Sequence, residues 1–148
     1  MLNTAMRFMS ECDRVGLKYR DSRDLEDGSS MVVCGVSGKN NARYDVLFIF
    51  DKDQHTVSER VVGLVSFEEE RDTAVRELVN ELNGTYRWFK FYVKQPGRVS
   101  VQADAIISED TADRICVELL IRTMKVIDEV YPKFMHVLWG NQGVGSRQ

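Results

Sequence analysis

The chain has 148 residues, of which 43% are hydrophobic and 29% are charged, and its formal net charge is -3. This composition is typical of one soluble domain with a buried core. A small negative charge without a cluster of lysines and arginines excludes the usual basis of nucleic-acid binding. The longest uncharged apolar runs are about five residues, far below the roughly 20 that span a bilayer, so we expect no membrane segment.

The first 15 residues carry charges at Arg7, Glu11, Asp13 and Arg14, which a secretory signal peptide would not have in its apolar core. The cysteines are odd in number and lie within apolar patterns, which favours buried reduced thiols over a disulfide. They are Cys12, Cys34 and Cys116. We therefore expect a cytoplasmic protein.

An amphipathic helix is predicted at the N-terminus, because apolar residues recur there at three- and four-residue spacing. Its expected inner stripe is Leu2, Ala5, Met6, Met9 and Cys12. Gly16 should end the helix, since glycine accepts the left-handed conformation. The polar residues 21–30 are expected to form a loop.

Three strands are predicted next, over residues 31–36, 44–50 and 56–65. Short polar turns separate them, so neighbouring strands should pair as antiparallel hairpins. The strand alternation predicts a buried face made of Tyr44, Val46, Phe48, Phe50, Val57, Val61 and Val65.

A middle helix should follow, with Ser66 as its N-cap and Glu69 completing a capping box. The expected buried stripe is Ala74, Val75, Leu78, Val79 and Leu82. The pair Asn83-Gly84 is expected to end the helix.

A second hairpin is predicted around Pro96-Gly97. A two-residue loop would mix polar and apolar side chains on both faces, whereas an odd-numbered connection would align Phe89 and Phe91 with Val101. Since the buried face sets the register, we predict a three-residue connection or a bulge. Trp88, Lys90 and Tyr92 would then share the opposite face with Gln102 and Asp104.

The last helix should begin at Ser108 and carry a long apolar stripe on to Tyr131. Pro132 is expected to kink or restart it, because proline lacks a backbone donor and clashes with the preceding turn. Phe134, Met135 and Leu138 should continue the apolar face. We expect one domain over residues 1–139 and a flexible tail over 140–148.

With these elements in this order, the chain resembles the YbjN family of proposed bacterial sensory transduction regulators, whose fold is similar to that of type III secretion chaperones. The resemblance extends from about Leu2 to Leu138. Its local similarities lie in residues 80–83, 89–93, 99–107 and 131–132.

This resemblance implies an α+β fold of order α-β-β-β-α-β-β-α, with a five-stranded antiparallel sheet and the helices on one face. It also implies frequent homodimers and no established enzymatic activity. Secretion chaperones of this fold bind extended client segments, so the resemblance implies a protein or peptide partner.

Catalytic and cofactor chemistry finds little support in the sequence. The only histidines, His55 and His136, lack metal-binding spacing, and residues 35–39 depart from a phosphate-binding loop. No nucleophile has a histidine nearby in sequence, and Asp104 is expected to face solvent or to pair with Lys90 across the hairpin. We expect no cofactor, no metal and no enzyme.

Outward aromatic side chains are the candidate partner-binding residues: Tyr86, Trp88 and Tyr92. Aromatic rings are favoured at interfaces because they bury much area at low entropic cost. The same face could instead pack against a loop or the chain terminus with Trp139. The expected function is binding another protein or itself, through this face or an exposed helix stripe. The alternative is a small-molecule sensor or an enzyme with a pocket between the terminal helix and the sheet.

Overall fold

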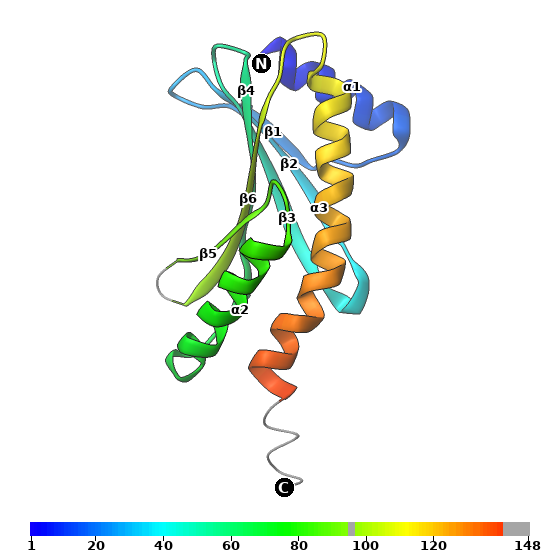
Figure 1. Ribbon diagram of the computed structural model, residues 1–148. Coiled ribbons are helices and arrows are strands. Elements are labelled where there is room, and N and C mark those ends of the chain that lie inside the picture. Colours follow the sequence, from blue (N-terminus) through cyan, green and yellow to red (C-terminus); the bar gives the residue numbers. More distant parts are fainter. Residues whose placement is uncertain (95–96, 141–148) are drawn as a thin grey trace, which may run out of the picture.

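The computed structural model describes residues 1–94 and 97–140. Its elements follow the order helix, four strands, helix, two strands, helix along the chain (Figure 1). The helices are α1 (Asn3–Val15), α2 (Asp72–Thr85) and α3 (Ala112–Met135). The strands are β1 (Asp21–Asp24), β2 (Ser30–Ser37), β3 (Arg43–Phe50), β4 (Thr56–Ser66), β5 (Lys90–Lys94) and β6 (Arg98–Ile106). Short helical turns also form at Lys39–Asn41, Glu69–Arg71 and His136–Gly140.

The strands form one six-stranded sheet in the order β1-β2-β3-β4-β6-β5, and every neighbouring pair is antiparallel. The predicted antiparallel α+β architecture is therefore confirmed, but the expected number of five strands is wrong. Strand β1 lies where a loop was predicted. All four of its residues are polar and exposed, so the sequence has no apolar alternation there that would indicate a strand.

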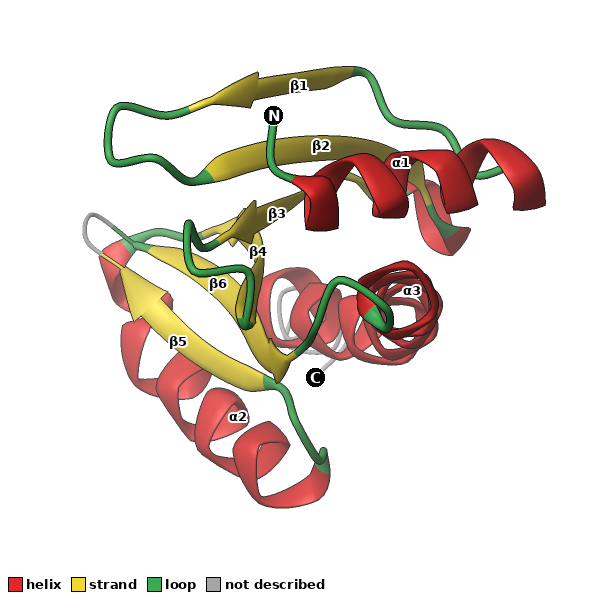
Figure 2. Cartoon of the chain, turned by 90° about the horizontal axis from the view of Figure 1, so that it is seen from above, coloured by secondary structure: helices red, strands yellow, loops and turns green. Residues whose placement is uncertain are grey.

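The sheet is curved, and α1 and α3 lie on its concave side while α2 flanks β5 (Figure 2). The buried residues of all three helices and of the sheet form one continuous core. The predicted inner face of β3 is confirmed, because Tyr44, Val46, Phe48 and Phe50 are all buried. One layer of helices and one layer of sheet thus share a single apolar interior.

The first helix ends at the predicted glycine, since Gly16 follows α1 with a φ of 80°. Its buried stripe differs from the predicted one. Phe8 is fully buried, with its ring 4.5 Å from that of Phe48, whereas Met6 is 44% exposed. The aromatic side chain fills the core better than methionine does, so the helix is rotated about its axis to bury Phe8.

Ser66 is not a helix cap. Strand β4 continues as far as Ser66, which pairs with Arg98, and α2 begins only at Asp72. The predicted inner stripe of α2 is otherwise confirmed, with Ala74 half-buried and the other members buried. The helix continues through Gly84 to Thr85.

The predicted register of the second hairpin is confirmed. Phe91 pairs with Val101 and Lys94 pairs with Arg98, which leaves three residues between the strands. Residues 95 and 96 of this connection lie outside the described part of the chain. The odd number of residues keeps Phe91 on the buried face, as the register argument required.

The last helix begins at Ala112, four residues later than expected, after Ser108 and Thr111 bond to each other. It continues through Pro132 to Met135 as one α-helix, so the helix does not restart at the proline. Phe134 and Leu138 extend the buried face as expected. Residues 141–148 of the predicted tail lie outside the described residues.

Candidate functional site: a groove beside Trp88

The strand β6 extends further than its partner β5. Pairing between them ends at Lys90 and Gln102, whereas β4 pairs with β6 as far as Ile106. Among the described strands, residues 103–106 of β6 therefore have a partner on one side only. An unpaired stretch of this kind presents backbone donors and acceptors that another strand can use.

A hollow of about 270 Å³ lies between this end of β6 and the helix α3. Its lining combines apolar side chains with charged ones: Trp88, Asp104, Ala105, Arg114, Ile115, Glu118, Leu119 and Arg122. We call it the Trp88 groove. An apolar floor with a few charged groups is typical of binding sites rather than of a plain solvated surface.

Trp88 has an unusual backbone conformation for its size. Its φ is 66°, in the left-handed region that costs a residue with a side chain about 1–2 kcal/mol. The indole is 64% exposed, and the Arg122 guanidinium lies 5.3 Å from the centre of its ring. A strained, exposed aromatic residue is more often found at a functional site than in a merely structural turn.

One ion pair and one hydrogen bond hold polar side chains on the α3 side of the groove. Arg122 binds Glu118 with a 3.1 Å ion pair one turn away on α3. The hydroxyl of Tyr86 donates to Glu129 at 2.8 Å, and the ring of Tyr86 packs 6.0 Å from that of Phe91. Burial, together with the bond to Glu129, raises the pKa of Tyr86 to about 12. A second hollow of about 230 Å³ joins Tyr86 to Trp88 and Arg122.

The structure separates the three aromatic residues that the sequence singled out. Tyr86 and Trp88 lie together beside α3. Tyr92 is half-buried within β5 opposite Ser100, on the other side of the sheet from Phe91. The predicted outer face shared by all three is therefore wrong. Alternation holds only inside β5, and Trp88 precedes that strand.

Asp104 lines the Trp88 groove and accepts hydrogen bonds from Gln102, at 3.2 and 3.3 Å. Lys90 pairs in register with Gln102 rather than with Asp104. Within the described residues, no ion pair joins Lys90 to Asp104. Of the two alternatives for Asp104, exposure to solvent is therefore confirmed.

Asn83 holds the start of β5 in place. Its side-chain amide donates to the Phe91 carbonyl at 2.9 Å, and its side-chain oxygen accepts from the Phe91 amide at 2.7 Å. The side chain thereby substitutes for a neighbouring strand at this edge of the sheet. It blocks further strand pairing at Phe91, so the free edge that remains beside α3 belongs to β6.

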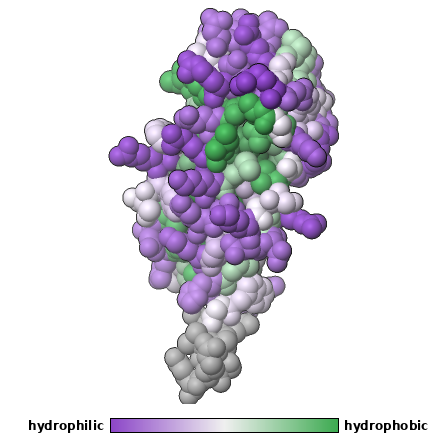
Figure 3. All heavy atoms as spheres, turned by 90° about the vertical axis from the view of Figure 1, so that its right-hand side faces the viewer, coloured by the Kyte–Doolittle hydropathy of each residue, from purple (hydrophilic) through white to green (hydrophobic). Residues whose placement is uncertain are grey.

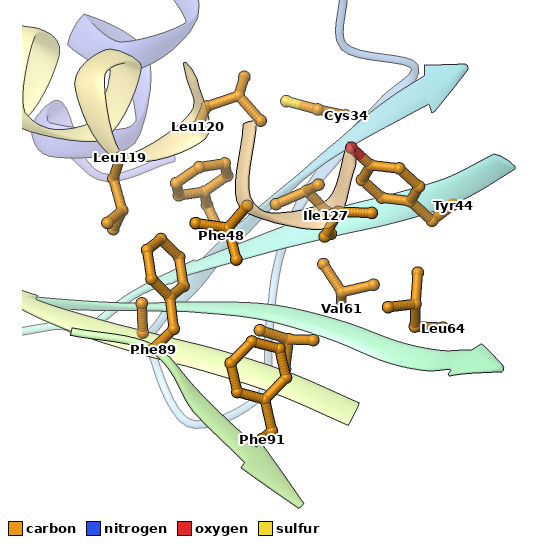
Figure 4. Close-up of a cluster of buried hydrophobic side chains, with 14 of the residues drawn as sticks. Cys34, Tyr44, Phe48, Val61, Leu64, Phe89, Phe91, Leu119, Leu120 and Ile127 are labelled. Atoms are coloured by element: carbon orange, nitrogen blue, oxygen red, sulfur yellow. The ribbon is translucent and has the colours of Figure 1, made fainter. Parts of the chain in front are cut away.

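A buried carboxyl was missed by the sequence analysis. Glu59 is only 2% exposed and lies on the inner face of β4 between Val57 and Val61. Its Oε1 atom is 2.6 Å from the hydroxyl oxygen of Thr123, on α3. The surrounding core is apolar, and Figure 4 shows Val61 and Phe48 of the sheet together with Leu120 and Ile127 of α3. An acid at an apolar position of the strand alternation was the feature that could have revealed it.

The face of the molecule on which α1 and α3 lie is largely hydrophilic, but it includes a hydrophobic patch (Figure 3). On these two helices the exposed large hydrophobic residues are Met6, Val15 and Ile121. The two helices therefore carry exposed apolar side chains on an otherwise hydrophilic face.

Other candidate chemistry has a structural explanation. All three cysteines are free and buried, as predicted. Lys39, in the loop compared with a phosphate-binding loop, donates its backbone amide to Asp128 at 2.9 Å. Within residues 1–94 and 97–140, no group of three or more His, Cys, Asp or Glu side chains is arranged to hold a metal ion. In the same residues, no helix is both long enough and apolar enough to cross a membrane.

Comparison with known proteins gave one match. The model of the YbjN family, described as "Putative bacterial sensory transduction regulator", matches residues 12–134. No curated protein and no solved structure matches the chain. The matched residues include every element that forms the Trp88 groove.

Proposed function

Because the chain belongs to the YbjN family, we propose that it is a regulatory, non-catalytic protein-binding domain whose Trp88 groove receives an extended segment of a partner. One observation carries this proposal: among the described strands, residues 103–106 of β6 have a partner on one side only, and they lie beside the exposed Trp88. The type III secretion chaperone-like architecture, which the resemblance implies, is part of the same proposal.

A bound segment would continue the line of β5. Its backbone would pair with residues 103–106, and alternate side chains would point into the hollow lined by Trp88, Ile115 and Leu119. Backbone hydrogen bonds supply affinity in this mode of recognition, and the pocket supplies specificity. A large apolar side chain, placed on the indole of Trp88, fits this lining best.

A peptide selection tests the proposal. Random peptides displayed on phage would be selected on the immobilised protein, and their affinities measured by fluorescence titration. We expect Trp88→Ala to weaken binding at least tenfold, because an aromatic anchor commonly contributes about 2 kcal/mol.

Trp139→Ala provides the matched control, because Trp139 is equally exposed, at 59%, but lines a different hollow. It should leave the affinity unchanged. Peptides that bind both variants equally well, or a selection that yields no binder, would rule out the Trp88 groove as a peptide site.

The same hollow also supports the alternative of a small-molecule sensor or an enzyme, since it lies between the terminal helix and the sheet. At about 270 Å³ it is slightly smaller than the roughly 300 Å³ at which the range of small-molecule sites begins. A metabolite that raises the melting temperature of the wild type, but not of Trp88→Ala, would favour this alternative over a peptide.

Self-association is a second way to bind protein. The face of the sheet opposite the helices exposes Ile106 by 85% and Val62 by 48%, and Tyr92 lies on the same face. These side chains support the proposal of a homodimer through that face. Light scattering that shows only monomer at tens of micromolar would remove it.

A further inference from the structure

Glu59 and Thr123 join the sheet to α3 through the middle of the core. Glu59 pairs in register with Phe48 on one side and with Ala103 on the other, so it lies in the centre of the sheet. Thr123 is 1% exposed. A buried polar pair of this kind persists only where its hydrogen bonds compensate for lost hydration.

The hydrogen bonds of Thr123 indicate which partner donates. Its hydroxyl oxygen is 2.6 Å from Glu59 Oε1 and 2.8 Å from the carbonyl oxygen of Leu119. A hydroxyl has one proton to donate, and a carbonyl oxygen can only accept. If Thr123 donates to Leu119, the short contact with Glu59 is a hydrogen bond only when the carboxyl group carries a proton and donates it.

We propose that Glu59 is a proton-binding site that controls how α3 is attached to the sheet. With the proton bound, Glu59 donates to Thr123, and Thr123 donates to Leu119. When the proton leaves to water, the hydroxyl of Thr123 turns to the carboxylate and releases the Leu119 carbonyl. The ligand of this site is therefore a proton, and the direction in which the Thr123 hydroxyl group donates depends on whether that proton is bound.

The other oxygen of Glu59 supports the protonated state. Oε2 is buried and has no hydrogen-bond partner among the described residues. Of the ion pairs within residues 1–94 and 97–140, none includes Glu59. An ionised carboxylate would therefore have a single donor in an apolar interior, which is unfavourable. Burial accordingly raises the pKa of Glu59 to about 8, although the bond to Thr123 opposes this effect.

Within the described part of the chain, the titratable groups around Glu59 come from four elements, and no cation contributes to the shift of its pKa. Tyr44 of β3 and Cys116 of α3 have pKa values raised by burial. The pKa of Cys34, on β2, is raised by its bond to Cys12 of α1 and by burial. Cys34, Tyr44 and Cys116 are thus neutral around neutral pH, whereas the bond to Cys34 lowers the pKa of the Cys12 thiol. A signal specific to a protonated carboxyl group is therefore needed to follow Glu59.

This site adjoins the Trp88 groove. The side chain of Leu119 lines the groove, while its carbonyl group accepts from Thr123. Arg122, the residue before Thr123, lies over the indole of Trp88. Release of the proton should therefore alter the surroundings of Trp88, whether or not the groove binds a partner.

Direct titration tests the proposal. The infrared band of a protonated carboxylic acid should be present in the wild type at pH 7, disappear with a midpoint near pH 8, and be absent from Glu59→Gln. Glu77→Gln, which removes an exposed carboxylate of α2, is the matched control and should retain the band. Absence of the band from the wild type at pH 7 would overturn the proposal.

Thr123→Val separates the proposed hydroxyl switch from simple burial. Valine has a similar shape but can neither accept from the protonated carboxyl group nor donate to the ionised one. Because the bond to the ionised form is the stronger of the two, the midpoint of the band should move to higher pH. A midpoint that stays unchanged or falls would show that Thr123 does not stabilise the ionised form, and would overturn the switch.

The fluorescence of Trp88, measured in a Trp139→Phe background, tests the link to the groove. Its emission should change with the same midpoint as the infrared band, and the change should vanish when Glu59→Gln is added. A change that persists in the Glu59→Gln variant would come from exposed charges near Trp88 and would overturn the link.

Discussion

Trp88 has a backbone conformation, and Glu59 a buried position, that are unfavourable for their residue types. A bulky side chain rarely has a positive φ, and a carboxyl group is rarely buried without a cation. Trp88 has a φ of 66°, and Glu59 is 2% exposed. Both are beside α3, on the surface and in the core respectively. Exceptions of this kind are expected where function, rather than stability, selects the residue.

The conformation of Trp88 leads to a prediction about its replacements. Trp88→Gly should be more stable than Trp88→Ala by about 1 kcal/mol, because glycine adopts a positive φ without strain. Urea denaturation of both variants measures the difference.

Tyr92 is the control for this comparison, because it lies within the strand β5. At position 92 the glycine variant should be less stable than the alanine variant by about 0.5–1 kcal/mol. An alanine variant at position 88 as stable as the glycine variant would contradict the strained conformation.

At the scale of elements, the edge strand β5 depends on α2 for its position. The two bonds between Asn83 and the backbone of Phe91 are 2.7 and 2.9 Å long. They connect the end of the helix to the strand that follows it. On its other side β5 pairs with β6 only as far as Lys90 and Gln102.

Asn83→Ala should lower the free energy of unfolding by about 2 kcal/mol, because two partly buried hydrogen bonds are lost at about 1 kcal/mol each. Hydrogen exchange should show faster loss of the Phe91 amide proton. The control is Asn80→Ala, one turn earlier on the exposed side of α2, which should change stability by less than about 0.5 kcal/mol. Equal effects of the two substitutions would contradict the role of Asn83.

At the scale of the whole molecule, Glu59 links stability to pH. Its pKa is raised from an ordinary value of 4.5 to about 8 in the folded state, so the folded protein binds this proton more tightly than the unfolded chain does. The stabilising contribution is complete below the unfolded pKa and is lost as the pH rises through the folded one. The shift corresponds to about 5 kcal/mol.

Chemical denaturation from pH 4 to pH 9 measures this loss. Glu59→Gln should match the wild type near pH 4, because the amide can also donate to Thr123, and should exceed it by up to about 5 kcal/mol at pH 9. Glu77→Gln should follow the wild type throughout. Parallel curves for the wild type and Glu59→Gln would show that Glu59 does not titrate in this range.

Much of the fold follows from periodicity along the chain. The inner face of β3, the stripe of α2 and the register of the second hairpin were predicted, because each depends on residues close in sequence. Strand β1 was missed, because its four polar residues are held by pairing with β2 and not by burial.

The candidate site was predicted only in part. Trp88 stood out by its type and position, but its place beside Arg122 depends on its own left-handed backbone conformation, which interrupts the alternation before β5 begins. Tyr92 follows the alternation of β5 and therefore lies away from Trp88. Glu59 had an unusual position in β4, yet nothing in the sequence names Thr123, 64 residues later, as its partner.

The sequence by itself determined the type of most elements, the antiparallel pairing and the apolar faces, because backbone geometry repeats at fixed short intervals. Only the tertiary structure decided which edge stays free, which side of the sheet Trp88 reaches and which helix meets Glu59. Those outcomes depend on how α3 packs across strands distant in sequence, and contacts between such distant residues have no local pattern.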